Sequence, residues 1–305
     1  MTRASIVVPS RGGAHRLPVL FESVRRQTEQ SLEVVVVVDG DVDDSESVVR
    51  AHQDDLPVRS IVFPENRGRA AALNAGFSSA SGEVFIRADD DLELEPDFVE
   101  HHVRLHAEAP RGVVAMCTDV FPDTPYARAY GIEADRAIRA AASSTPPERA
   151  WQWWSGNVST TADDFHRVGG YDEDFRAYGW EDIEWGYRLH LLDREILVAD
   201  GFTTLHHGPV TSTVERLERA YASGAAYAKF VEKHGDVWPD AGPSDRSPWN
   251  LLVAGSSRLA TARSVSSTGR ALDRVADRLP HYVAHKLVAL SVQAAARSGR
   301  RRSGR

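Results

Sequence analysis

The stretch Val84–Asp91, with the sequence VFIRADDD, decides how this chain of 305 residues folds. A short apolar run ends in three consecutive aspartates, and Leu92–Pro96 follows them directly. Adjacent carboxylates repel one another and resist burial, so a strand that ends in them usually has a cation to neutralise them. A solvated acidic turn is the other interpretation of an isolated triplet. The rest of the sequence decides between the two.

Strand-like and helix-like segments alternate before this stretch. The first two strand-like segments, Ser5–Pro9 and Leu32–Val38, are rich in β-branched residues, as in parallel strands covered on both faces. Further strands are expected at 58–63 and 84–88, with helices at 17–27, 45–52 and 69–80. This order predicts an α/β fold with an open, mostly parallel sheet flanked by helices. Ligands of such sheets bind beyond the carboxyl ends of the strands, where Asp39 and Asp89–Asp91 fall.

The second half of the chain is less regular. We expect a helix at 97–109, a strand at 113–120, an insertion with one short helix at 122–147, and strands at 196–199 and 203–206. Helical spacing also marks 180–189 and 214–234, and 240–248 is the best linker candidate because Pro, Gly and Ser are frequent in it. The sequence has no Gly-rich dinucleotide fingerprint after the first strand and no P-loop lysine motif, which argues against NAD-type and P-loop proteins.

Composition indicates the class of protein and the compartment in which it works. Hydrophobic residues make up 42% and charged residues 26% of the chain, as in ordinary globular proteins. The only cysteine, Cys117, excludes an intramolecular disulfide and any multi-cysteine metal site, and it favours a reducing compartment. Ser5 already belongs to a strand-like segment, and no apolar run reaches the roughly eighteen residues that span a bilayer. We therefore expect no signal peptide and a cytoplasmic protein.

Three groups of side chains could carry chemistry. In an extended segment Asp89 and Asp91 project to one side and Asp90 to the other, so one pair can address a Mg or Mn ion, which prefers oxygen ligands. An Asx-type turn is the alternative. Glu181 and Asp182 would occupy the first turn of a helix, where the helix dipole favours carboxylates even without a catalytic role.

Histidines form the third group. His206 ends a strand-like run and is either a ligand or a packed residue. His102 and His106 form an i, i+4 pair without the pattern of a metalloprotease, and we expect them on the solvated face of an amphipathic helix.

Taken together, these segments resemble the family 2 glycosyltransferases, enzymes with the GT-A fold. The matching elements of the first half are 5–10, 32–39, 66–76 and 82–91. A galactosyltransferase-like acceptor-side pattern follows at 154–159, 169–175 and 179–182, and ends at His206. Leu73 stands where many members have a basic residue, and Arg87 where a hydrophobic residue is common, so the donor sugar does not carry over.

The resemblance implies a GT-A catalytic domain at 1–210, with a nucleotide-sugar half at 1–120 and an acceptor half at 121–210, followed by a helical extension at 211–305. It also implies an inverting, metal-dependent transfer of a sugar from a nucleoside-diphosphate donor to an acceptor hydroxyl. A UDP-sugar is favoured as donor, and the acceptor would be a glycan, a lipid-linked sugar or a small molecule.

The same resemblance assigns roles to individual residues. Asp182 would be the general base, with Glu181 holding a sugar beside it. Asp91 and Asp89, with His206, would bind the divalent metal, Mn or Mg. The expected nucleotide-sugar contacts are Pro9, Arg11, Asp39, Asn66, Arg69, Asn74, Asp89 and Asp90. The expected acceptor contacts are Trp154, Gly156, Asn157 and Trp180, with Trp153 as a further stacking platform.

Two other functions compete with sugar transfer. A sugar-phosphate nucleotidyltransferase also joins a nucleotide-binding sheet to an aspartate pair, but the Gly-rich activation loop expected near its N-terminus is missing. A non-catalytic nucleotide-sugar binding module needs no base, and Asp182 argues against it.

The C-terminal part is basic, although the whole chain has a net charge of −8. Residues 258–305 hold eleven Arg or Lys and two Asp, and 282–296 can form a helix with a broad apolar face. Such a segment can lie against the inner face of an anionic membrane, or it can pack on the catalytic domain and end in a disordered tail. We expect no nucleic-acid partner, because the acidic body would repel it.

Overall fold

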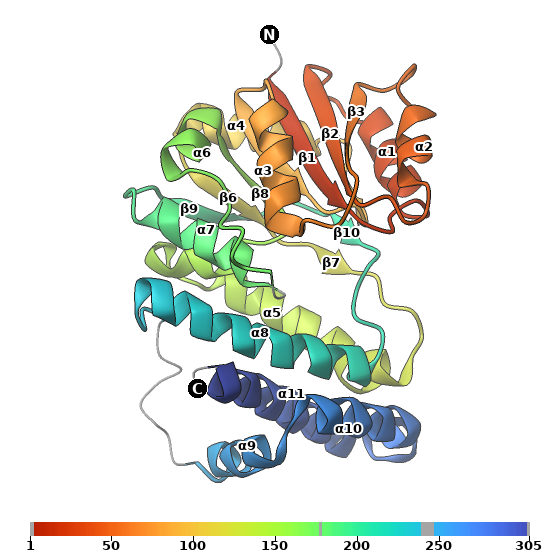
Figure 1. The fold of residues 1–305 in the computed structure, drawn as a ribbon, viewed down its shortest axis with the longest axis vertical. Helices are drawn as coiled ribbons and strands as arrows, with labels where there is room; N and C mark the ends of the chain where they lie inside the picture. Colours follow the sequence, from red (N-terminus) through yellow and green to blue (C-terminus); the bar gives the residue numbers. More distant parts are fainter. Residues whose placement is uncertain (1–2, 177–178, 239–246, 304–305) are drawn as a thin grey trace. The chain divides into compact units, whose positions relative to one another are not determined.

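The computed structural model describes residues 3–176, 179–238 and 247–303 (Figure 1). The chain divides into two compact units. The first unit comprises residues 1–119, 139–176 and 181–208, and the second comprises 120–138, 177–180 and 209–305. Every strand that the structure describes lies in the first unit.

A seven-stranded sheet forms the centre of the first unit, with the order β3-β2-β1-β4-β8-β6-β9. Its strands are β1 (Ala4–Ser10), β2 (Leu32–Asp39), β3 (Val58–Phe63), β4 (Val84–Ala88), β6 (Gly112–Ala115), β8 (Asn157–Thr161) and β9 (Ile196–Ala199). All neighbours in the sheet are parallel except β8, which runs antiparallel to both β4 and β6. The predicted open, mostly parallel sheet is therefore confirmed.

A second sheet has three very short strands in the order β5-β10-β7. They are β5 (Leu92–Glu93), β7 (Thr118–Asp119) and β10 (Leu205–His206). His206 pairs with Leu92 on one side and with Asp119 on the other. The strand expected at 113–120 is thus divided into β6 and β7, and the small sheet carries His206 to the end of the aspartate triplet.

Helices cover both faces of the large sheet (Figure 1). Successive side chains of each strand point to opposite faces, so each strand packs against helices on both sides. The helices are α1 (Leu17–Arg25), α2 (Ser45–Arg50), α3 (Arg69–Ser79), α4 (Phe98–Glu108), α6 (Ala162–Val168) and α7 (Trp180–His190). Ile6 and Val8 pack in one core cluster with the apolar residues of α1 and α4. Val7 points the other way, toward α3, where a Cβ atom at Gly76 would lie 2.3 Å from its Cγ1. Phe85 lies on the α3 and α6 side as well, stacked against Phe77.

His102 and His106 are buried, so the prediction that they lie on a solvated face is wrong. Their Nδ1 and Nε2 atoms lie 2.8 and 2.7 Å from the same hydroxyl, that of Ser159 on β8. A hydroxyl can donate to one ring and accept from the other, so each histidine has one partner inside the core, whereas His102 Nε2 and His106 Nδ1 have no hydrogen-bond partner among the described residues. The sequence did not predict their burial because four of the five residues of β8 are polar. No strand was expected there to cover the face of α4 that carries the two histidines.

The second unit is helical in its described residues. Its elements are a π-helical turn at Ala127–Gly131, the start of α5 (Ile132–Ser143), α8 (Thr213–His234), α9 (Pro248–Leu259), α10 (Ala262–Val275) and α11 (His281–Ser303). Among the described residues, no helix is both long enough and apolar enough to cross a membrane. Most of the linker expected at 240–248 lies outside the described residues, and its last two, Ser247 and Pro248, cap and begin α9.

The buried histidines predict a loss of stability in acid. Burial lowers the pKa of His106 from 6.5 to about 4, so the unfolded chain binds more protons between these two pH values. The free energy of unfolding should be retained above about pH 6.5 and should fall toward pH 4, with His106 contributing on the order of 3 kcal/mol. Chemical denaturation at a series of pH values should show this slope in the wild type and in His15→Gln, an exposed control. An unchanged slope in His106→Gln would contradict the assignment.

Candidate active site

The three aspartates that follow β4 have three different environments. Asp90 is buried, and its carboxylate accepts hydrogen bonds from the Ser10 hydroxyl at 2.6 Å and from the Arg16 guanidinium at 2.9 Å. Burial raises the pKa of Asp90, although Arg16 and Ser10 oppose the shift. A Cβ atom at Gly13 would lie 2.3 Å from Oδ2 of Asp90, so the glycine lets the loop after β1 approach. Asp90 therefore holds that loop in place.

Asp89 lies against the backbone at the start of β8. Its amide donates to the Gly156 carbonyl at 3.0 Å, and a Cβ atom at Gly156 would lie 2.4 Å from Asp89 Oδ2. Only glycine leaves room for this carboxylate. Burial acts to raise the pKa of Asp89, but the charges of Arg87 and Arg69 outweigh it and hold the pKa below its usual range.

Asp91 faces His206. Its Oδ2 atom lies 3.3 Å from His206 Nε2, and His206 Nδ1 lies 2.6 Å from Oδ1 of Asp119. Burial alone would lower the pKa of His206, but the hydrogen bonds and charges of Asp119 and Asp91 raise it to about 10. Within the described part of the chain, the buried Oδ1 atom of Asp91 has no hydrogen-bond partner.

The Asp91–His206 pair fits one face of a divalent metal site. A buried carboxylate oxygen without a partner costs free energy, and a cation would satisfy it. A metal bound at Nε2 of His206 would replace the proton there, and Asp119 would orient the ring from Nδ1. The described residues contain no group of three or more His, Cys, Asp or Glu side chains already arranged to hold a metal. Water and phosphate oxygens would thus complete the shell, as is usual for Mg and Mn.

Arg87 contacts both Asp89, at the end of β4, and Asp182, in the first turn of α7. This side chain is 1% exposed, projects from β4 on the same side as Phe85, and contacts the Asp182 carboxylate through Nη1. Its Nη2 lies 3.1 Å from Oδ1 of Asp89. The helix α7 places Asp182 in its first turn, where both Asp182 and Glu181 are buried. A single guanidinium is thus shared between the carboxylates of Asp89 and Asp182.

The predicted nucleotide contacts surround the ends of β1 and β2. Both carboxylate oxygens of Asp39 accept backbone N–H bonds, from Arg67 at 2.6 Å and Gly68 at 2.9 Å. Gly68 has a φ of +94°, which favours glycine, and its amide also donates to Oδ1 of Asn66 at 3.0 Å. Arg11 donates to the carbonyl of Asp39 at 2.9 Å. Pro9, near the end of β1, pairs with Val37. These residues form one loop cluster, and their contact with a base stays a prediction.

Arg69 and Asn74, at the start and middle of α3, tie this helix to the acceptor-side segments. Arg69 lies 3.6 Å from Oε1 of Glu181, and its side chain is 42% exposed. Asn74 donates to the Tyr171 carbonyl at 2.9 Å and accepts from the Tyr171 amide at 2.7 Å. Asn74 therefore holds the 169–173 segment, and a direct contact with the nucleotide sugar stays a prediction.

The predicted acceptor residues are mostly buried. Trp154 is 2% exposed and stacks on Trp185 at 5.0 Å, and Trp180, which belongs to the second unit, packs against Tyr227 and Phe230 there. Asn157 donates toward Thr204 at 3.3 Å and Cys117 at 3.4 Å. Trp153 is half-buried and donates to Thr145 at 2.8 Å. Contact of these side chains with an acceptor stays a prediction.

Sequence reasoning missed three residues that the structure brings to the site. Arg16 binds Asp90, Asp119 orients His206, and Arg87 bridges Asp89 and Asp182. A charged side chain inside an otherwise apolar strand was the available signal for Arg87, because such a residue is buried only with partners. Asp119 lay near the end of an expected strand, at the sheet edge where ligands bind.

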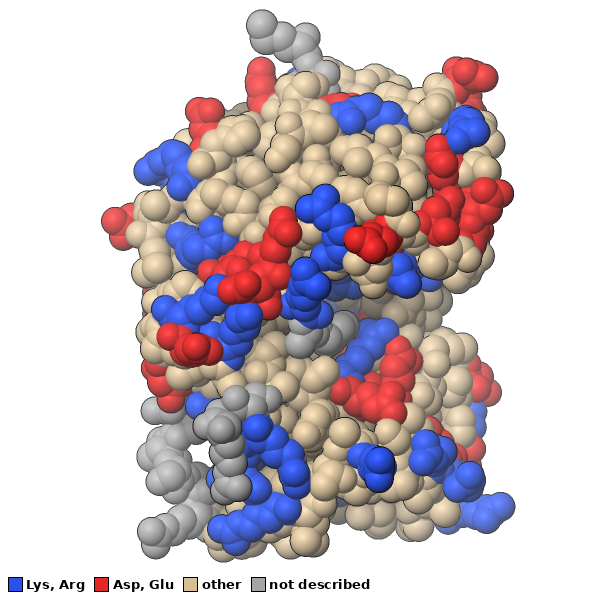
Figure 2. Space-filling model, viewed as in Figure 1, with Lys and Arg blue, Asp and Glu red and all other residues tan. Residues whose placement is uncertain are grey.

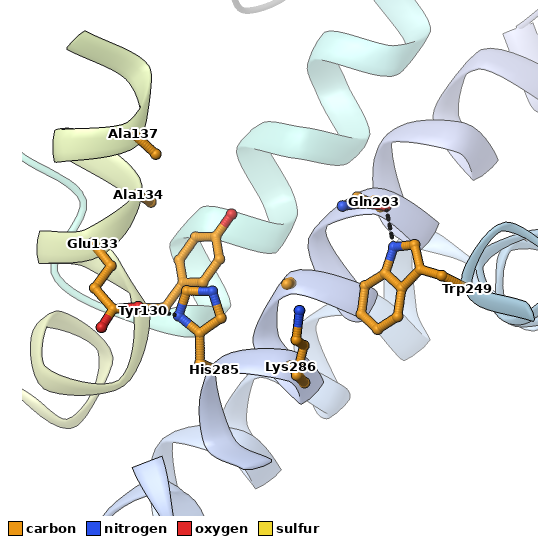
Figure 3. Close-up of a pocket in the computed structure, with 9 residues that line it drawn as sticks. Tyr130, Glu133, Ala134, Ala137, Trp249, His285, Lys286 and Gln293 are labelled. Atoms are coloured by element: carbon orange, nitrogen blue, oxygen red, sulfur yellow. Dashed lines mark hydrogen bonds and ion pairs between the residues drawn. The ribbon is translucent and has the colours of Figure 1, made fainter. Parts of the chain in front are cut away.

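The second unit contains a separate pocket of about 340 Å³ (Figure 3). It is lined by Tyr130, Glu133, Ala134, Ala137, Trp249, His285, Lys286, Ala289 and Gln293. None of these residues belongs to the predicted site.

Comparison with known proteins agrees with the class that this fold and site define, the GT-A glycosyltransferases. The model of Glycosyl transferase family 2 matches residues 5–177. The chain belongs to this family, which confirms the predicted resemblance.

Two enzymes named validoxylamine A glucosyltransferase, from Streptomyces hygroscopicus subspecies jinggangensis and limoneus, are each 34% identical over 77% of this chain. The chain spans 62% and 58% of their respective lengths. Glucosyl-dolichyl phosphate glucuronosyltransferase of Haloferax volcanii is 30% identical over 53% of either chain.

Among solved structures, the mannosyltransferase PcManGT from Pyrobaculum calidifontis, in complex with GDP-Man and Mn2+, has a TM-score of 0.64 at 20% identity. This similarity covers 97% of the present chain and 86% of PcManGT. TarS of S. aureus in complex with UDP has a TM-score of 0.55 at 14% identity, covering 99% and 92%. At such identities these structures show the fold alone, and they confirm it as GT-A.

The Arg87 bridge predicts a large effect on stability. Arg87→Met leaves the buried Asp182 carboxylate and the half-buried Asp89 carboxylate without their shared cation, which should lower the free energy of unfolding by about 3–5 kcal/mol. Arg25→Met is the matched control, because Arg25 pairs with Asp55 at 40% and 50% side-chain exposure and should change stability by less than about 1 kcal/mol. Urea denaturation of the two variants tests this. Equal losses of unfolding free energy in Arg87→Met and Arg25→Met would contradict the stabilising role of Arg87.

Proposed function

We propose that this chain is a metal-dependent glycosyltransferase that moves a hexosyl group from a nucleoside-diphosphate donor to an acceptor hydroxyl with inversion. One observation carries the proposal. Asp91 and His206 face each other with a buried, unpartnered carboxylate oxygen, at the same sheet edge where Arg87 ties Asp89 to Asp182. Membership of the glycosyltransferase family also supports sugar transfer and argues against a nucleotidyltransferase or a binding module.

Asp91 and His206 would hold the metal, and Asp89 would lie beside the ribose or the sugar. A bound divalent ion would stabilise the negative charge that develops on the departing nucleoside diphosphate. Arg69, partly exposed and next to Glu181, is suited to the diphosphate or the base. Asp39, with the loop 66–68 that it orders, would contact the base.

Asp182 is the proposed general base. It would accept the proton of the acceptor hydroxyl while that oxygen attacks the anomeric carbon from the face opposite the diphosphate. The contact with Arg87 fixes the orientation of the Asp182 carboxylate before substrate binds, which reduces the reorganisation needed for reaction. Glu181, the preceding residue in the first turn of α7, would hold a sugar hydroxyl.

The substrates are proposed from the relatives. Their names include glucosyl and glucuronosyl transfer, and the solved GT-A structures hold GDP-Man or UDP. We favour a UDP-sugar donor and a hexose of the glucose series. The acceptor would be a small molecule or a lipid-linked or glycan chain. Calorimetry with UDP, GDP and dTDP, each with and without Mn, identifies the nucleobase of the preferred donor.

The proposed metal site requires the imidazole of His206. His206→Ala removes the imidazole that faces Asp91, so Mn-dependent binding of the preferred nucleoside diphosphate should weaken by about tenfold or more. His207→Ala is the matched control, because the His207 imidazole pairs with Glu93 at 2.9 Å, and the substitution keeps the backbone amide that donates to the Asp91 carbonyl. Calorimetry measures both variants. Equal losses in the two, or none in His206→Ala, would contradict the metal site.

The proposed general base requires the carboxylate of Asp182. Asp182→Asn keeps the size of the side chain and cannot accept the proton, so kcat for transfer should fall by about 10²–10⁴-fold while the nucleotide still binds. Asp163→Asn is the control, because Asp163 is an exposed carboxylate in the first turn of α6. Release of nucleoside diphosphate with a panel of acceptors measures turnover, and NMR of the product gives its anomeric configuration. Near wild-type turnover of Asp182→Asn would rule out this base, and a retained configuration would rule out inversion.

A further inference from the structure

Helix α9 turns a row of leucines toward solvent. Leu251, Leu252 and Leu259 are 61%, 56% and 81% exposed. Their spacing of one and seven residues places them on one side of the helix, and we call them the leucine ridge. Water-exposed leucines at this density are uncommon in a helix that has no partner on that side.

The opposite side of α9 explains why the ridge faces outward. Trp249, Val253 and Ser257 follow one another at intervals of four residues, and Val253 and Ser257 are buried. Trp249 belongs to this row and donates from its indole nitrogen to Gln293 of α11 at 2.9 Å (Figure 3). The ammonium group of Lys286 lies 5.4 Å from the centre of the Trp249 ring. The row packs α9 against α11 and leaves the leucine ridge without a cover in the described chain.

Helix α11 adds apolar surface beside this contact. Tyr282, Val283 and Leu287 are 71%, 40% and 38% exposed and surround Lys286 on the helix. An apolar surface that is interrupted by a lysine is typical of a helix at a membrane interface, where the long side chain reaches the headgroups.

The segment that carries the leucine ridge has a net positive charge. Residues 248–303 carry ten Arg or Lys and two Asp. Both aspartates have partners: Asp273 accepts from the amides of Thr213 and Val214, and Asp277 pairs with Arg128. Figure 2 shows Lys and Arg side chains outnumbering acidic ones over the part of the surface where Figure 1 places α9–α11. The partner of this surface must therefore be both apolar and negatively charged.

We propose that α9, with the start of α11, is a docking surface for an anionic phospholipid bilayer. The leucine ridge would enter the boundary between headgroups and acyl chains, and Arg258, Arg263 and Lys286 would meet lipid phosphates. No described helix can span a bilayer, so the contact is peripheral. A second copy of this chain is the less favoured occupant, because a two-fold contact would bring like charges together. The proposal is independent of the proposed transfer reaction.

Vesicle flotation of the full chain tests the docking surface. The wild type should float with vesicles of phosphatidylcholine mixed with phosphatidylglycerol, should float poorly with phosphatidylcholine alone, and should detach as salt rises. A variant that combines Leu251→Ser, Leu252→Ser and Leu259→Ser should bind at least about tenfold more weakly. A variant that combines Arg258→Gln, Arg263→Gln and Lys286→Gln should lose roughly fivefold for each charge.

Leu191→Ser is the matched control, because Leu191 is 57% exposed in the first unit and should leave flotation unchanged. Thermal midpoints of all variants check folding, which exposed substitutions should preserve. Failure of the wild type to float, or flotation of the leucine variant equal to wild type, would overturn the proposal. A fall in molar mass of the leucine variant by light scattering, without a change in flotation, would assign the ridge to self-association instead.

Discussion

The buried guanidinium of Arg87 is the contact on which the proposed catalytic edge depends. Asp182 and Glu181 are buried in the first turn of α7, and the half-buried Asp89 shares Arg87 with Asp182, so these carboxylates would repel one another without a cation. Arg87 contributes a positive charge from within the sheet, and Arg69 adds a second, partly exposed one. Because Arg87 contacts both Asp89 and Asp182, it links the end of β4 to the first turn of α7 inside the first unit.

The aspartate triplet is a set of three residues with separate tasks. Asp90 is saturated by Ser10 and Arg16 and holds the loop after β1. Asp89 is fitted against Gly156 and neutralised by Arg87. Asp91 faces His206 and keeps one buried oxygen without a partner among the described residues. The chain turns at Asp90 and Asp91, where the Leu92 amide donates to the Asp89 carbonyl at 3.3 Å, and the three side chains therefore reach different partners and not one side of an extended segment, as the sequence predicted.

The sequence predicts the strands and helices of the first half almost to the residue, because β-branched runs and helical spacing mark them clearly. It fails at β8, where a polar sequence forms a central strand, and consequently at His102 and His106, which that strand covers. The residues Asp89, Asp91, His206 and Asp182 were predicted at the site from a family resemblance. Their partners Arg87, Arg16 and Asp119 depend on which strands become neighbours, and the sequence pattern alone does not contain that information.

The central claim is that a divalent ion binds between Asp91 and His206 at the end of the triplet. Anomalous X-ray diffraction at the manganese edge, from crystals grown with Mn and the preferred nucleoside diphosphate, tests it most directly. The account predicts one strong peak within bonding distance of an Asp91 carboxylate oxygen and of His206 Nε2, with phosphate oxygens completing the shell. A nucleotide bound with no peak there, or a peak coordinated by Asp90 in place of Asp91, would contradict it.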